Sequence, residues 1–107
     1  MDVMNSAVAC SLTALEFQER RSGGLRKVRS AVIEVKELES GYAYRFPSDV
    51  AWIAELANLI TLERQCCPFL RFSIRLEPGE GPIWLELSGP EGTKDFLNSI
   101  FSLFLIE

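Results

Sequence analysis

Two adjacent cysteines are the residues of this chain whose type and spacing most directly suggest chemistry. Cys66 and Cys67 lie in the segment ERQCCPF at positions 63–69; the only other cysteine is Cys10, and the 107 residues include no histidine. Thiols are therefore the only side chains here whose ordinary pKa lies near neutrality. If the protein performs chemistry near pH 7, we expect it to be sulfur chemistry.

The first interpretation of these cysteines is a soft-metal site. Glu63 precedes Cys66 by three residues and Cys67 by four, so a helix would place the carboxylate beside both sulfurs. Cys10 could supply a third sulfur if its segment folds back. Thiolates suit Zn(II), Cu(I) and heavier soft ions. The Cys-x-x-Cys spacing is absent, however, and no histidine can complete a mixed ligand set.

Redox catalysis and simple packing are the two other interpretations. A helix C-terminus disfavours a thiolate, and a histidine base is missing, so we rank catalysis below binding and favour a non-enzymatic function. A disulfide between adjacent cysteines would be strained, because their Cα atoms lie about 3.8 Å apart, below the usual minimum of about 4.4 Å. Cysteine also behaves as a small buried hydrophobe, and Cys67 continues an apolar helical stripe.

Composition and charge describe a single soluble domain spanning residues 1–107. Apolar residues make up 48% of the chain and charged residues 24%, which is typical of a globular protein. The net charge of −4 argues against nucleic acid as the main partner. No apolar run reaches the roughly 18 residues of a membrane span, and no export signal is evident. We therefore expect a cytoplasmic protein with reduced thiols.

The order of elements predicts an α+β fold. A capping box at Thr13 predicts a first helix to about Ser22, with a break or a weak continuation at Gly23-Gly24. A hairpin is expected over residues 31–46, followed by a helix that is N-capped at Ser48 and ends before Pro68.

A second hairpin and a last helix complete the predicted fold. Apolar and polar residues alternate over 70–77 and 83–88 on either side of a Pro- and Gly-rich turn. A last helix should begin near Thr93. We expect a helix followed by two β-hairpin–helix units, giving a four-stranded antiparallel sheet with helices on one face. Residues 96–106 are apolar around most of a helix, which favours a homodimer.

The sequence also resembles a family of small, uncharacterised bacterial proteins. The resemblance is carried by ERQCCPF at 63–69, WLELSGPEG at 84–92 and the following Phe96-Leu97. The segments 9–13 and 41–47 also resemble the family, so the match covers most of the chain. The family is loosely associated with gene neighbourhoods of heavy-metal regulators. The resemblance implies that Cys10, Cys66 and Cys67 form a three-thiol set, which would suit Hg(II) or As(III).

The best functional hypothesis is thus thiol-based binding of a soft metal or metalloid ion, for sequestration or as an accessory to sensing. Cys66 and Cys67 would be the primary metal ligands, Cys10 the third, and Glu63 an auxiliary group. The first alternative is a non-enzymatic interaction or regulatory module with structural cysteines and an open sheet face as its working surface. The second alternative is a thiol oxidoreductase.

Overall fold

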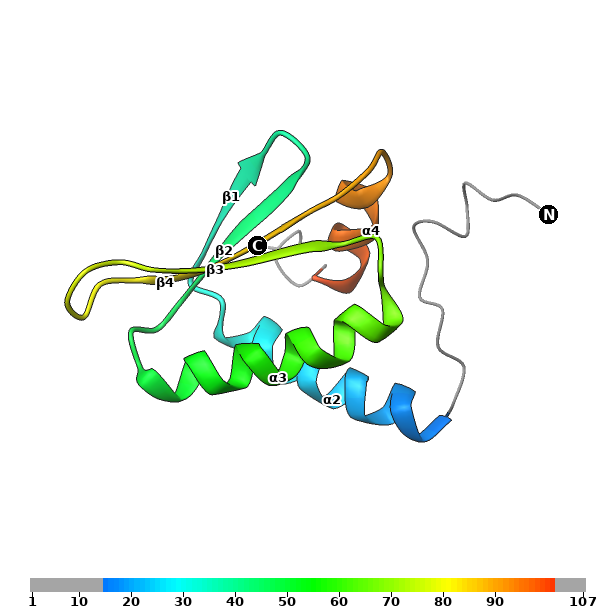
Figure 1. Ribbon diagram of the computed structural model, residues 1–107, viewed down its shortest axis with the longest axis horizontal. Helices are drawn as coiled ribbons and strands as arrows, with labels where there is room; N and C mark the ends of the chain where they lie inside the picture. Colours follow the sequence, from blue (N-terminus) through cyan, green and yellow to red (C-terminus); the bar gives the residue numbers. More distant parts are fainter. Residues whose placement is uncertain (1–14, 102–107) are drawn as a thin grey trace.

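The computed structural model describes residues 15–101, and these form three helices around a four-stranded antiparallel sheet (Figure 1). In chain order the elements are α2 (Leu15–Ala31), β1 (Glu34–Leu38), β2 (Gly41–Phe46), α3 (Val50–Cys66), β3 (Arg71–Leu76), β4 (Ile83–Ser88) and α4 (Thr93–Ile100). The strand order is β1-β2-β4-β3, so β2 and β4 are the central strands and β1 and β3 are the edge strands. The predicted α+β fold and element order are confirmed.

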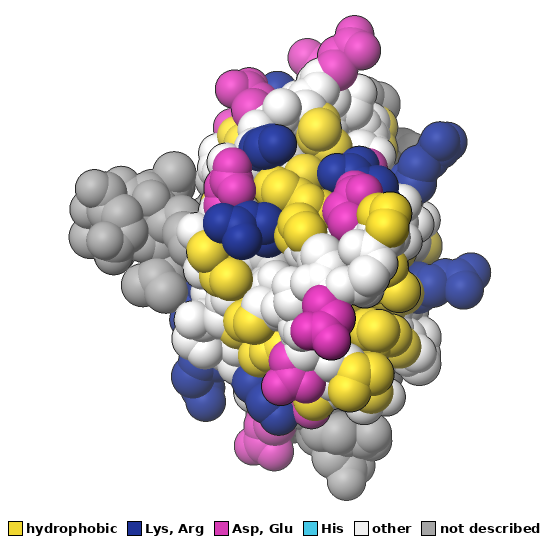
Figure 2. Space-filling model, turned by 90° about the vertical axis from the view of Figure 1, so that its left-hand side faces the viewer, with side chains coloured by type: hydrophobic (Ala, Val, Ile, Leu, Met, Phe, Trp, Pro, Cys, Tyr) yellow, Lys and Arg dark blue, Asp and Glu magenta, His cyan; other side chains and the backbone are white. Residues whose placement is uncertain are grey.

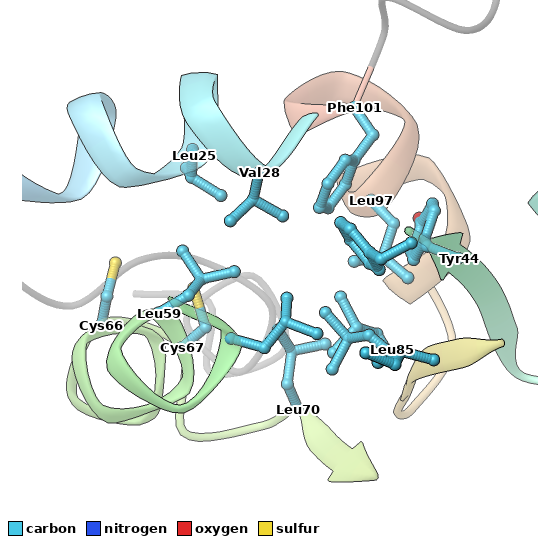
Figure 3. Packing of buried hydrophobic residues seen from close by; sticks show 14 residues of the cluster. Leu25, Val28, Tyr44, Leu59, Cys66, Cys67, Leu70, Leu85, Leu97 and Phe101 are labelled. Carbon is cyan, nitrogen blue, oxygen red and sulfur yellow. The ribbon is translucent and has the colours of Figure 1, made fainter. Parts of the chain in front are cut away.

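The core forms where the helices cover one face of the sheet. Tyr44 on β2 and Ile74 on β3 both pair with Leu85 on β4, so their side chains share that face. Leu97 within α4 and Phe101 just after its end close one side of this cluster (Figure 3). Phe101 stacks on Tyr44 with ring centroids 4.4 Å apart. Burial raises the pKa of the Tyr44 hydroxyl, so this group stays neutral inside the core.

Helix α2 runs without a break through Gly23 and Gly24, so the alternative of an interrupted helix is wrong. It also extends to Ala31, where a strand was predicted to begin. The reason is tertiary packing: Leu25 and Val28 are buried against the rest of the core, and this contact outweighs the weak helix propensity of glycine. The predicted start of the helix at Thr13 lies outside the described residues.

The start of α3 differs from the prediction by one residue. Asp49 is the N-cap, and its carboxylate accepts a hydrogen bond of 2.9 Å from the backbone N–H of Ala51. Ser48, the predicted cap, instead donates its hydroxyl to the backbone oxygen of Gly81 at 3.0 Å. Asp and Ser are about equally good caps, so the choice depends on the turn between β3 and β4, which provides the acceptor for Ser48.

The sheet face opposite the helices carries charged side chains, and these cover the tryptophan at its centre. Trp84 is only 5% exposed there, since Lys36 lies over its ring with the ammonium 4.9 Å from the ring centroid and Arg75 flanks it at 5.8 Å. Arg75 is held by Glu77 at 2.8 Å and Glu86 at 2.6 Å. The open sheet face on which the interaction-module alternative relies therefore presents charged side chains, and its tryptophan is covered.

Two glycine substitutions test this account of α2 and of the β1–β2 turn. Gly23→Ala should stabilise the protein by about 0.5–1 kcal/mol, because the position is helical and a Cβ there meets no atom within 4 Å. Gly41→Ala should destabilise it by more than about 2 kcal/mol, since the new Cβ would collide with the backbone oxygen of Leu87. Urea unfolding monitored by circular dichroism measures both. A Gly23→Ala variant that is less stable than wild type would contradict an intact helix.

Candidate thiol site at the end of α3

The C-terminal end of α3 is shaped by the Cys67-Pro68 step. Helix α3 ends at Cys66, and Cys67 is the C-cap, with its N–H donating to the backbone oxygen of Glu63 at 2.6 Å. The residue before a proline is driven away from helical geometry, so Pro68 fixes this end. The backbone oxygen of Cys67 then accepts from the N–H of Leu70 at 3.1 Å, which turns the chain directly into β3.

All three predicted groups at this end are buried. Glu63 is 2% exposed, and Cys66 and Cys67 are 0% exposed. Both cysteines belong to the main apolar cluster, together with Leu59 and Leu70 (Figure 3). Glu63 is therefore not an ordinary surface carboxylate. A buried Glu was not evident from the sequence; the only signal was its four-residue spacing from Cys67 on a helix.

The carboxylate of Glu63 contacts the sulfur of Cys67. Cys67 Sγ donates to Glu63 Oε1 at 3.7 Å, across one turn of the helix and in buried surroundings. A buried carboxylate needs hydrogen-bond partners, because its desolvation is costly without them. The structure thus brings two of the four predicted site residues into direct contact, and it does so inside the core.

The sulfur of Cys66 lies apart from that contact. Figure 3 shows the side chain of Cys66 farther from the centre of the apolar cluster than that of Cys67, and Cys66 is disulfide-bonded. Cys67 keeps its thiol, so the two adjacent cysteines are not bonded to each other. Cys10, the remaining predicted ligand, lies outside the described residues. Cys66 must therefore be reduced before it can act as a thiolate ligand.

Within residues 15–101 the structure contains no group of three or more His, Cys, Asp and Glu side chains placed to hold a metal ion. Glu63 and Cys67 are in contact, but a complete ligand set needs a further donor from elsewhere. The described helices are also too short or too polar for any of them to cross a membrane.

Two hollows lie on the surface near the ends of α3. A groove of about 530 Å³ runs between α3 and β3, lined by Ile60, Arg64, Leu70, Phe72 and Ile74. A smaller hollow of about 250 Å³ lies between the start of α3 and the β3–β4 turn, where Val50 is 77% exposed and Leu76 51% exposed. Figure 2 views the molecule from the side of this turn and shows apolar side chains at the surface among charged ones.

No protein-family model, curated protein or solved structure matches the chain. The resemblance to the bacterial family around the ERQCCPF and GPEG segments therefore stays a prediction.

Cys67 is fully buried, so we expect its thiol to be protected from alkylating reagents in the folded protein. In a variant with Cys67 as the single cysteine (Cys10→Ser, Cys66→Ser), iodoacetamide should label the native protein at least about tenfold more slowly than the urea-unfolded protein, because the helix end must open first. Intact-mass spectrometry over time gives both rates. Equal rates would show that the end of α3 is open to solvent.

Proposed function

We propose that the end of α3 binds a soft metal or metalloid ion through Cys66 and Cys67, with Glu63 as the auxiliary group. The observation that carries this proposal is the buried contact between Cys67 Sγ and Glu63 Oε1. A thiol must lose its proton to become a ligand, and a carboxylate already hydrogen-bonded to that thiol is placed to accept it. The apolar surroundings exclude water from the ligand atoms.

The donor set selects the class of ion. Two or three thiolates without histidine suit soft ions such as Hg(II), As(III) or Zn(II) and are poor ligands for Mg(II) or Ca(II). Because the described residues hold no complete ligand set, the proposal assigns Cys10 as the third donor and requires Cys66 to be reduced. A cytoplasmic location is part of the proposal, since that compartment keeps thiols reduced. Sequestration, or delivery to a sensor, is the role such a site would serve.

Binding of the ion is tested by native mass spectrometry on protein reduced with a phosphine and mixed with one equivalent of Hg(II), arsenite or Zn(II). Wild type should retain one ion for each site, and the Cys66→Ser/Cys67→Ser double variant should retain none. Serine nearly preserves the volume of cysteine, and a urea unfolding curve of the variant checks its fold. A folded double variant that retains the ion would overturn the proposal.

The role of Glu63 has a separate test. Glu63→Gln keeps the shape of the side chain but removes the proton acceptor, so the affinity for the retained ion should fall about 10- to 100-fold. Competition with a chelating dithiol measures the affinity. Glu55→Gln, on the same helix but outside the core, is the matched control and should leave the affinity unchanged.

Disulfide exchange is a second candidate function, favoured by the disulfide at Cys66. One thiolate of a dithiol substrate attacks Cys66 Sγ and releases the partner thiolate. The second substrate thiolate then attacks the mixed disulfide, which leaves Cys66 reduced and the substrate oxidised by two electrons. Both cysteines are buried, so this exchange also requires the helix end to open.

Counting thiols in the unfolded protein separates the two candidates. Protein isolated under alkylating conditions that trap its cellular state should show three alkylated thiols if its resting state is a reduced metal-binding site. One alkylated thiol, rising to three after reduction, would favour disulfide exchange. Three thiols without any retained ion would instead indicate structural cysteines in an interaction module.

A further inference from the structure

Among the described residues 15–101, the strand β3 is an open edge of the sheet. It pairs with β4, and the strand order places it at one end (Figure 1). The backbone N–H of Glu77 donates to the backbone oxygen of Pro82 on the neighbouring chain segment at 3.2 Å. Because backbone groups alternate in direction along a strand, the N–H and C=O groups of Arg71, Ser73 and Arg75 also point toward β4. The backbone N–H and C=O groups of Phe72, Ile74 and Leu76 therefore point away from the sheet. Such a row is a ready template for another strand.

The opposite edge is protected in a way that β3 is not. Strand β1 has five residues, three of them charged: Glu34, Lys36 and Glu37. Lys94 from α4 lies against it and bonds Glu37 at 2.7 Å. Charged side chains on an edge strand of this kind oppose pairing with a second chain. On β3 the charges are confined to Arg71 and Arg75, both on the sheet face away from the helices.

The segment Arg71–Glu77 is complementary to itself when it runs antiparallel. We propose that two copies of the chain join β3 to β3 in this way, with Ile74 on the two-fold axis. Arg71 then lies opposite the partner's Glu77, Phe72 opposite the partner's Leu76, and Ser73 opposite the partner's Arg75. Opposite residues of an antiparallel pair share one face, so each charged pair stays on the outer face and each apolar pair on the helix side.

Charge selects this register over its neighbours. A shift of two residues in one direction places Arg71 opposite the partner's Arg75. A shift of two residues in the other direction places Arg75 opposite the partner's Arg75. Like charges directly across a strand pair are destabilising, whereas the proposed register forms two Arg71–Glu77 pairs. Arg75 already pairs with Glu77 and Glu86 of its own chain. Within residues 15–101 the Arg71 side chain forms no hydrogen bond or ion pair, so it is available to add a second cation to the partner's Glu77.

Apolar surface beside β3 supplies the attraction. The groove between α3 and β3 is lined mainly by Ile60, Leu70, Phe72 and Ile74, and Leu76 beyond it is 51% exposed. A second copy related by the two-fold axis presents the same side chains to this surface. The joined sheets would form eight continuous strands with the helices of both copies on one face.

The test uses charge reversal and mixing. Wild type should elute with twice the chain mass of 12.0 kDa in size-exclusion chromatography with light scattering. Arg71→Glu places two carboxylates opposite each other, and Glu77→Arg places two guanidinium groups opposite each other, so each variant alone should lose the dimer and elute at the monomer mass. Mixing the two variants restores both opposite-charge pairs, and native mass spectrometry should then show the mixed dimer. Circular dichroism checks that each variant is folded.

Arg26→Glu, an exposed residue of α2, is the matched control for the change in charge and should remain dimeric. A monomeric wild type would overturn the proposal. So would an Arg71→Glu variant that stays dimeric, because the interface would then lie elsewhere. A pair of folded variants that remain monomeric after mixing would also overturn the proposed register.

Discussion

The burial of one face of β2 and β4 beneath the three described helices is the constraint on which the rest of the structure depends. Tyr44, Phe46 and Leu85 are at most 2% exposed, and they pack beneath residues of α2, α3 and α4. Strand register follows from this burial, because a slip of one residue would move every apolar side chain to the opposite face. The same packing keeps α2 helical through its two glycines, since Leu25 and Val28 must reach this core.

The candidate site is a consequence of how α3 packs on that core. A helix that buries Leu56 and Leu59 also buries positions one and two turns later on the same side, and those positions hold Glu63, Cys66 and Cys67. A carboxylate there loses its water, so a neighbouring donor stabilises it, and the Cys67 sulfur donates to Glu63 Oε1. The contact that supports thiol chemistry therefore follows from helix periodicity and does not require a dedicated loop.

Sequence patterns predicted the elements better than they predicted exposure. Alternation over residues 70–88 was sufficient for β3 and β4, because their apolar face packs against helices as the pattern requires. It was insufficient for Trp84, whose burial depends on Lys36 of a strand that is distant in sequence. Glu63 was predicted beside the cysteines from helical spacing alone, but its burial follows from the tertiary position of α3. The N-cap moved from Ser48 to Asp49 for a similar reason, since Ser48 has a partner in the β3–β4 turn.

The thiol site and the open edge of the sheet are joined by a very short piece of chain. Cys67 caps α3, its backbone oxygen holds Leu70, and β3 begins at the next residue. Opening the helix end to admit an ion must therefore strain or release the hydrogen bond that positions the start of β3, where Arg71 would meet the partner's Glu77. The two proposals nevertheless rest on different groups, sulfur and carboxylate in one and backbone and charge pattern in the other. Removing the thiols changes none of the side chains in the proposed Arg71–Glu77 pair, and reversing charges on β3 changes neither Glu63 nor Cys67, so either proposal can fail without the other.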